Sequence, residues 1–146
     1  MSKKAFAVEP ADRPKALNIL CEQITFLSSI KSYDGYEVFL QEGPAGSGPP
    51  PHQHDWDESF FVLEGAIEFG FGSEQMTAAP GTLVHLPAGT THWFRFGADG
   101  GRMLSMTGEG SNAAQFFTDV DEASPDGSLD LEKLVRVADR HSLRLG

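Results

Sequence analysis

The chain has 146 residues, which suits one domain with a single hydrophobic core. Its 21 acidic and 11 basic residues give a net charge of −10, which argues against a nucleic-acid partner and against an anionic membrane surface. No run of about 20 apolar residues occurs, so no membrane-spanning helix is expected. The first residues lack a signal-peptide core and Cys21 is the only cysteine, so a cytoplasmic location is expected.

Short strand-like segments separated by turns fill most of the chain. Residues 1–15 are predicted to form a loose N-terminal arm. Apolar runs follow within 16–29 and at 36–41, and Cys21 is predicted to pack in the first run as a small buried residue. Sixteen glycines and nine prolines fit many short strands joined by turns better than long helices. The sequence therefore predicts an all-β fold class.

Helical spacing appears only near the C-terminus. Ser111 is a predicted N-cap for a short helix that begins at residue 113. Further on, Leu134, Val135 and Ala138 follow helical periodicity, which predicts an amphipathic helix packed on the β domain or on a partner subunit.

Candidate metal ligands concentrate just after a run of prolines at 49–51. His52 and His54 are two residues apart, so on an extended chain both imidazoles point to the same face. The prolines favour extended backbone before them. Glu58 begins the next predicted strand, 58–63, and its carboxylate can face the two imidazoles.

A second cluster supplies a further histidine. A short apolar strand is predicted at 83–86, and Pro87 and Gly89 mark a tight turn after it. His92 then opens another apolar strand at 93–96. Because the turn returns the chain sharply, His92 can reach a site formed elsewhere.

Imidazole and carboxylate together suit Fe, Ni, Zn, Mn or Cu, and this donor set does not choose among them. The predicted ligands of one divalent transition metal are His52, His54, Glu58 and His92. Because Cys21 is far from them and alone, a thiolate site is excluded. Two histidines at this spacing also occur on surfaces and in cores, so the pair alone leaves a structural role open.

Taken together, the two clusters resemble the motifs of the cupin family. The first family motif, G-x5-H-x-H-x3-E-x6-G, is matched at every fixed position. The second, G-x5-P-x-G-x2-H-x3-N, is matched except at its last position, where Phe96 replaces asparagine. The flanking segments, from about residue 17 to 120, are similar to those of quercetin-dioxygenase-like cupins. The matching residues are Gly46, His52, His54, Glu58 and Gly65, then Gly81, Pro87, Gly89 and His92.

This resemblance implies a double-stranded β-helix, or jelly-roll, barrel over residues 16–110. A C-terminal helical extension of the same domain would follow over 111–146. It also implies a metal-dependent cupin with a small-molecule ligand, and a homodimer, since small cupins often dimerise. The favoured function is a dioxygenase-like enzyme acting on an aromatic or flavonoid-like molecule. A non-catalytic binding or sensing cupin, and a metal-assisted isomerase or lyase, stay open as alternatives.

Further residues of the predicted site follow from strand parity. Phe60 shares parity with Glu58, while Phe94 and Phe96 share parity with His92, so all three are predicted to line an apolar substrate pocket. Glu58 is also the candidate catalytic residue, as a proton acceptor. The parity of His85 leaves open whether it lines the pocket or packs elsewhere.

Overall fold

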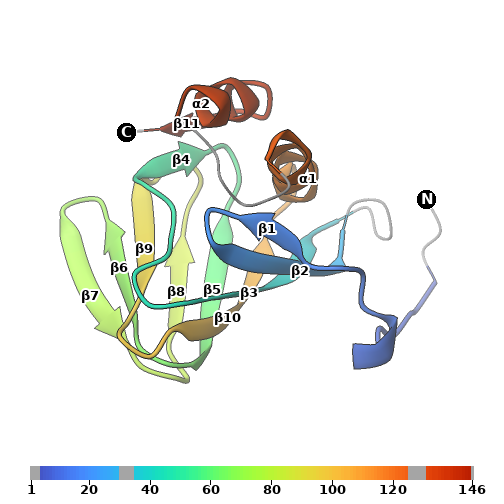
Figure 1. Cartoon of the computed structure of the whole chain (residues 1–146), viewed down its shortest axis with the longest axis horizontal. Coiled ribbons are helices and arrows are strands. Elements are labelled where there is room, and N and C mark those ends of the chain that lie inside the picture. The colour runs from blue at the N-terminus through green and yellow to red at the C-terminus, as the bar shows by residue number, and fades with distance from the viewer. Residues whose placement is uncertain (1–3, 30–34, 125–130, 146) are drawn as a thin grey trace.

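Two antiparallel sheets face each other in the computed structural model, which describes residues 4–29, 35–124 and 131–145 (Figure 1). The six-stranded sheet contains, in spatial order, β1 (Leu17–Ile19), β2 (Glu22–Ser28), β3 (Glu37–Gly43), β10 (Gly101–Thr107), β5 (Glu58–Glu64) and β8 (Leu83–Leu86). The five-stranded sheet contains β11 (Leu143–Leu145), β4 (His52–His54), β9 (His92–Phe96), β6 (Ile67–Phe71) and β7 (Glu74–Ala78). This arrangement confirms the predicted jelly-roll barrel.

Side chains alternate between the two faces of each strand, and those that point inward fill the space between the sheets. In β5, Phe60 and Val62 are buried, whereas Phe61 between them is exposed. The same alternation operates in β9 and β6, because successive residues of a strand point to opposite faces. The resulting core consists of Phe60, Val62, Ile67, Phe69, Ala78, Val84, Leu86, Phe94, Phe96 and Met103.

A second apolar cluster joins one end of the barrel to the helices α1 (Ala113–Ala123) and α2 (Leu131–Asp139). Figure 1 shows α1, α2 and β11 together at this end, next to β4. Phe39 of β3 is fully buried there, and its ring lies 5.7 Å from that of Phe117. The cluster also includes Ile19, Ile24, Trp56, Phe116, Val120, Leu134, Val137, Ala138 and Leu143.

The N-terminal hairpin of β1 and β2 turns at two residues with left-handed backbone. Leu20 has a φ of 49° and Cys21 a φ of 71°. Cys21 is exposed at this turn, so the prediction that it packs as a buried residue is wrong. The reason is that β1 and β2 are two strands joined by a two-residue turn, and the middle of such a turn projects into solvent. Before the hairpin, the N-terminal arm contains one 3-10 helical turn, Pro10–Asp12, with no buried residue.

Helix α1 is fastened to the barrel by a buried carboxylate. Glu37 of β3 accepts hydrogen bonds through Oε1 from Ser111 Oγ at 2.8 Å and from the backbone N–H of Ala114 at 3.2 Å. Ser111 Oγ in turn accepts from the N–H of Ala113 at 3.1 Å. The helix has Asn112 at the N-cap position, one residue after the predicted cap. Ser111 still satisfies a free N–H of the first turn, as a capping side chain does.

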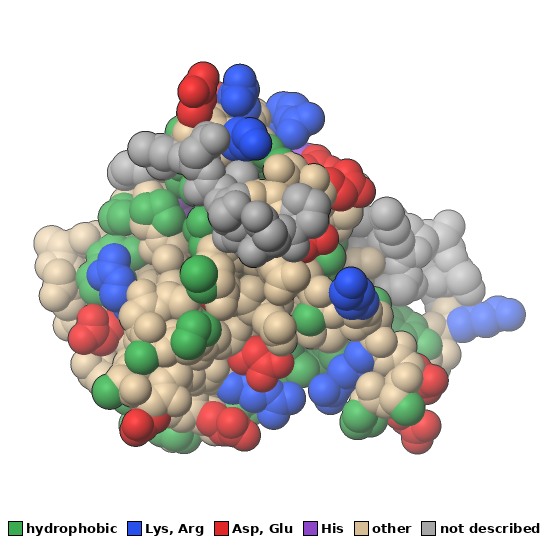
Figure 2. All heavy atoms as spheres, in the orientation of Figure 1, with side chains coloured by type: hydrophobic (Ala, Val, Ile, Leu, Met, Phe, Trp, Pro, Cys, Tyr) green, Lys and Arg blue, Asp and Glu red, His purple; other side chains and the backbone are tan. Residues whose placement is uncertain are grey.

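The C-terminal extension is not purely helical, which corrects the sequence prediction. After α2 the chain forms β11, which pairs antiparallel with β4, so that Leu143 lies opposite His54 and Leu145 opposite His52. The end of the described chain therefore supports the strand that carries two candidate ligands. Among the described residues, no helix has the length and apolar character needed to cross a membrane. Figure 2 shows acidic and basic side chains interspersed over the face toward the viewer.

Gly65 follows the last residue of β5, and replacing it with alanine measures how much this motif glycine contributes to the stability of the fold. Its φ is +75°, and a Cβ there would overlap the carbonyl oxygen of Gly100 and lie 3.0 Å from Gly101 Cα. We expect Gly65→Ala to lower the free energy of unfolding by about 2–3 kcal/mol, from left-handed strain and the clash together. Gly72→Ala is the matched control, because its φ is +60° but no atom lies within 4 Å of the added Cβ. Strain alone should cost Gly72→Ala about 1 kcal/mol. Equal losses for the two variants in urea unfolding would contradict the role of the clash.

Candidate metal centre

Three histidines converge where β4 and β9 pair. His52 and His54 are the first and last residues of β4, and His92 is the first residue of β9. His52 pairs directly with His92 across the two strands. One ring nitrogen from each of the three histidines lies within 4.8 Å of those of the others. Strand parity thus places the imidazoles on one face, as the spacing predicts.

Two backbone contacts bring the turn before His92 against the first cluster. The N–H of Gly89 donates to the carbonyl oxygen of His54 at 2.9 Å. The N–H of Ala88 donates to Asp57 Oδ1 at 2.8 Å. These contacts join segments more than thirty residues apart and direct the chain so that His92 enters β9 beside His52.

Each imidazole is held by a hydrogen bond from Nδ1 to a backbone carbonyl. An Nδ1–H donor leaves Nε2 with a free lone pair, and such a contact is the usual support of a metal-bound histidine. The carbonyl partners are Pro50 for His52 at 2.9 Å, Trp56 for His54 at 2.9 Å, and Thr90 for His92 at 2.8 Å.

The Nε2 lone pairs of His54 and His92 point toward the carboxylate of Glu58, and this arrangement suits a bound cation. Glu58 Oε1 lies 3.1 Å from His54 Nε2 and 3.8 Å from His92 Nε2. The Nε2 atom of His92 is buried and has no hydrogen-bond partner. Two lone pairs that face each other at hydrogen-bond distance require a proton or a metal ion between them. Together with the buried, unpaired nitrogen, this makes the donor set suitable for a divalent transition metal.

Burial keeps two of the histidines in the neutral form that binds metals. The loss of hydration lowers the pKa of His52 to about 3, and the proximity of His92 lowers it further in the same direction. Burial also lowers the pKa of His92, although the nearby Glu58 carboxylate opposes this shift. Both imidazoles are therefore uncharged at neutral pH and need lose no proton at Nε2 to become ligands.

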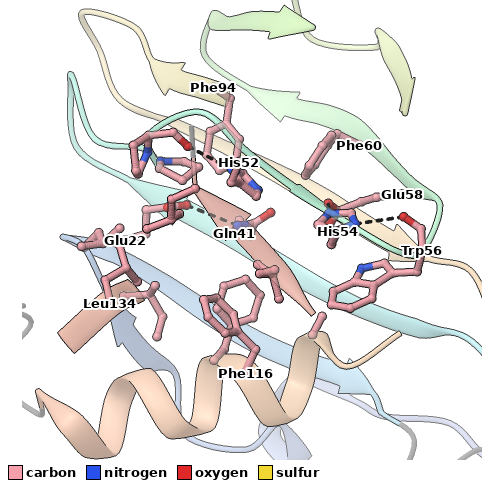
Figure 3. Close-up of a pocket in the computed structure, with 18 residues that line it drawn as sticks. Glu22, Gln41, His52, His54, Trp56, Glu58, Phe60, Phe94, Phe116 and Leu134 are labelled. Atoms are coloured by element: carbon pink, nitrogen blue, oxygen red, sulfur yellow. Dashed lines mark hydrogen bonds and ion pairs between the residues drawn. The ribbon is translucent and has the colours of Figure 1, made fainter. Parts of the chain in front are cut away.

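A largely apolar cavity opens beside the histidines (Figure 3). His52, His54 and Glu58 form part of its wall. The N-terminal hairpin, the barrel and the C-terminal extension all contribute to it, so segments from both ends of the described chain complete the cavity. The other lining residues are Ile19, Leu20, Glu22, Gln41, Pro49, Pro50, Trp56, Phe60, Phe94, Ala113, Phe116, Phe117, Leu134, Leu143 and Leu145.

The predicted aromatic residues do not all line this cavity. Phe60 and Phe94 are on its wall, as expected from parity. Phe96 points inward too and is 2% exposed, but it packs in the core between the sheets, away from the described lining. It lies two residues beyond Phe94 on β9, close to Gly43 and Gly101. Strand parity correctly predicts that Phe96 faces the inside of the barrel. It does not predict how far along the barrel Phe96 lies from the three histidines.

His85 does not belong to the site. It is exposed on β8, and its Nδ1 is 2.8 Å from Ser59 Oγ on the neighbouring strand. Val84 and Leu86 are the buried residues of β8, so His85 lies on the outer face with Leu83. This placement resolves the alternative that the sequence left open.

Sequence reasoning missed five polar or aromatic residues of the cavity wall, namely Glu22, Gln41, Trp56, Phe116 and Phe117. Trp56 stacks on His54 with ring centroids 4.5 Å apart and an interplanar angle of 8°. The position of Glu22 could have been predicted from strand parity. Glu22 is two residues before Ile24 on the same strand, so both side chains lie on its apolar face. A carboxyl group on such a face is unusual unless it has a partner or a function.

Comparison with known proteins agrees with this geometry. Residues 39–106 match the family model described as the cupin domain. Over residues 39–106 the chain therefore contains a cupin domain, and it resembles quercetin-dioxygenase-like cupins. Quercetin 2,3-dioxygenase of Bacillus subtilis (strain 168) is 31% identical over 78 residues, which cover 52% of this chain and 23% of that protein. The match thus spans about a quarter of the relative's length.

Solved structures with the same fold are more distant in sequence. KdgF from Halomonas sp. aligns with a TM-score of 0.65 at 17% identity, covering 77% of this chain and 99% of that one. An RmlC-like cupin from Shewanella frigidimarina gives a TM-score of 0.68 at 11% identity, with 78% and 99% covered. The polyketide cyclase RemF from Streptomyces resistomycificus gives 0.62 at 20% identity, with 72% and 80% covered. These similarities support the cupin barrel fold.

Proposed function

We propose that this protein is a metal-dependent enzyme of the dioxygenase type that acts on an aromatic small molecule. The observation that carries the proposal is the convergence of three imidazoles, each supported at Nδ1, beside an apolar cavity whose wall includes His52 and His54. The similarity to a quercetin 2,3-dioxygenase supports oxygen chemistry as the reaction class.

His52, His54, His92 and Glu58 are the residues that would hold the metal. When bound, a divalent transition metal supplies Lewis acidity and, if it is redox-active, oxygen chemistry. The chain's own contribution is to hold all three imidazoles in place through their Nδ1 hydrogen bonds, to keep His52 and His92 neutral by burial, and to exclude water with apolar walls. Glu58 borders both the histidines and the cavity, so it is placed to accept a proton from a substrate hydroxyl through Oε1 or Oε2.

The cavity walls favour an aromatic ligand. Phe60, Phe94, Phe116, Phe117 and Trp56 provide ring faces and edges that suit stacked or edge-to-face contacts. No Lys or Arg occurs among the described residues that line the cavity, so it offers no cation to a phosphate group. We therefore expect flavonols and catechols to be better substrates than sugar phosphates.

Oxygen consumption tests this proposal. Purified protein loaded with Fe²⁺, Ni²⁺, Mn²⁺, Cu²⁺ or Zn²⁺ is mixed with a panel of flavonols and catechols in an oxygen electrode. We expect uptake with at least one redox-active metal and none with Zn²⁺. Glu58→Gln should reduce the rate by about 100-fold or more, as the loss of a positioned proton acceptor does. His85→Ala, an exposed histidine outside the site, should leave the rate unchanged.

The same assay separates the alternatives. Loss of substrate without oxygen uptake would identify a metal-assisted isomerase or lyase. Ligand binding with neither substrate loss nor oxygen uptake would identify a binding or sensing cupin. Either result would contradict the dioxygenase proposal. The homodimer and the cytoplasmic location stay predictions.

A further inference from the structure

One carboxyl group on the cavity wall belongs to neither cupin motif. Glu22 begins β2, is 3% exposed, and lines the cavity together with His52 and Glu58. Figure 3 shows its side chain beside Gln41, which lies between Glu22 and the histidines in this view. The metal chemistry described above makes no use of Glu22.

A chain of hydrogen bonds from the barrel centre orients Glu22. Ser105 Oγ, on the fully buried side of β10, donates to Gln41 Oε1 at 2.6 Å. This contact directs the amide nitrogen of Gln41 toward Glu22, where Nε2 donates to Oε1 at 3.4 Å. Oε1 of Glu22 is thus engaged, and among the described residues no protein donor bonds to Oε2. One oxygen of a buried carboxyl group is left for a ligand.

The surroundings of Glu22 favour its uncharged form. No Lys or Arg of the described chain pairs with it, and an unpaired buried carboxylate is costly. Burial raises the pKa of Glu22 well above its ordinary value, and the negative charge of Glu58 raises it further. A neutral carboxyl group whose Oε1 accepts from Gln41 carries its proton on Oε2, which is then a hydrogen-bond donor inside an apolar cavity.

We propose that Glu22 is the polar recognition residue of this cavity, and that its Oε2 donates a hydrogen bond to a carbonyl oxygen of an aromatic ligand. The inference deepens the proposed function by defining the substrate class as aromatic ketones or related carbonyl compounds. The cavity also holds a second unpaired donor, since Nε1 of Trp56 is buried and without a partner. A ligand that lacks oxygen acceptors would leave both donors unsatisfied, which costs binding energy.

Two ligands of similar size test the proposal without requiring turnover. Acetophenone carries the carbonyl oxygen, and ethylbenzene replaces it with hydrogen atoms. Binding of each to the full-length protein is measured by NMR titration, both as purified and after removal of metal with a chelator. The variants are Glu22→Leu, Glu22→Gln and Trp56→Phe. Glu22→Gln keeps a hydrogen-bond donor and nearly the same shape at this place while removing the carboxyl group, so it separates hydrogen-bond donation from other effects of replacing Glu22.

We expect Glu22→Leu to weaken acetophenone binding by about five- to tenfold, which is the scale of one hydrogen bond. Ethylbenzene binding should not weaken in that variant, and Glu22→Gln should retain the preference for acetophenone. An infrared difference spectrum between wild type and Glu22→Gln should contain a protonated-acid carbonyl band that shifts when acetophenone is added. A merely structural role for Glu22 would affect both ligands alike and would leave that band unshifted.

Several outcomes would overturn the proposal. These are equal binding of the two compounds by wild type, loss of the acetophenone preference in Trp56→Phe but not in Glu22→Leu, an ionised Glu22, and no binding of either compound. None of them depends on metal content or oxygen uptake, so failure here is distinguishable from failure of the proposed enzyme activity.

Discussion

Replacing His92 with alanine is expected to abolish tight metal binding. Wild type should take up about one divalent ion per chain, whereas His92→Ala should bind at least about 100-fold more weakly. Loss of a hydrogen-bond partner behind a ligand already weakens metal binding by roughly 10- to 100-fold, so loss of the ligand itself should weaken it at least as much. His92 is 2% exposed and its buried Nε2 has no hydrogen-bond partner, which is the state expected of a nitrogen that serves as a metal ligand. Calorimetric titration and elemental analysis after dialysis give the affinity and the stoichiometry.

The matched control for this prediction is another histidine of the same chain. His85→Ala removes an exposed imidazole on the outer face of β8 and should leave metal content unchanged. Metal should also raise the melting temperature of wild type and His85→Ala but not of His92→Ala, because a ligand that binds only the folded state stabilises it. A wild type unable to take up Fe, Ni, Zn, Mn or Cu would refute the metal centre.

Phe96→Asn is expected to destabilise the fold without altering the ligand cavity. Phe96 is 2% exposed among core residues, and its ring centroid lies 5.7 Å from that of Phe94. Truncating a buried phenylalanine typically costs about 3–5 kcal/mol. A buried amide without hydrogen-bond partners adds to this cost. The measurement is the free energy of unfolding in urea, compared with the acetophenone affinity of the folded variant.

Phe61→Asn is the control, because Phe61 is 36% exposed on the outer face of β5. Its free energy of unfolding should change by no more than about 1 kcal/mol. A selective loss of ligand affinity in Phe96→Asn, with stability retained, would instead place Phe96 on the cavity wall.

Period-two alternation explains why so much of the site is predictable. His52 and His54 flank a single residue, so local spacing places both on one face of β4. Glu58 and His92 each open a strand, and the buried residues that alternate after them lie on the same face as these two side chains. The strand at 83–86 is found with its predicted bounds, because Pro87 ends it after a short apolar run. By contrast, the exposure of Cys21 depends on a hairpin turn that its composition does not signal.

The sequence by itself predicted an all-β fold, the candidate ligands and the shared face of His52 and His54, because these follow from spacing and turn residues within short segments. The barrel was implied by the resemblance of the two histidine clusters to the cupin motifs. Only the tertiary structure decided the depth of Phe96, the outward position of His85 and the pairing of β11 with β4. It also decided that Glu22 lines the cavity that the histidines border. The physical reason is that parity specifies a side of a strand but not a height along the barrel. The closure of the cavity depends on contacts between segments at opposite ends of the chain, which no local pattern encodes.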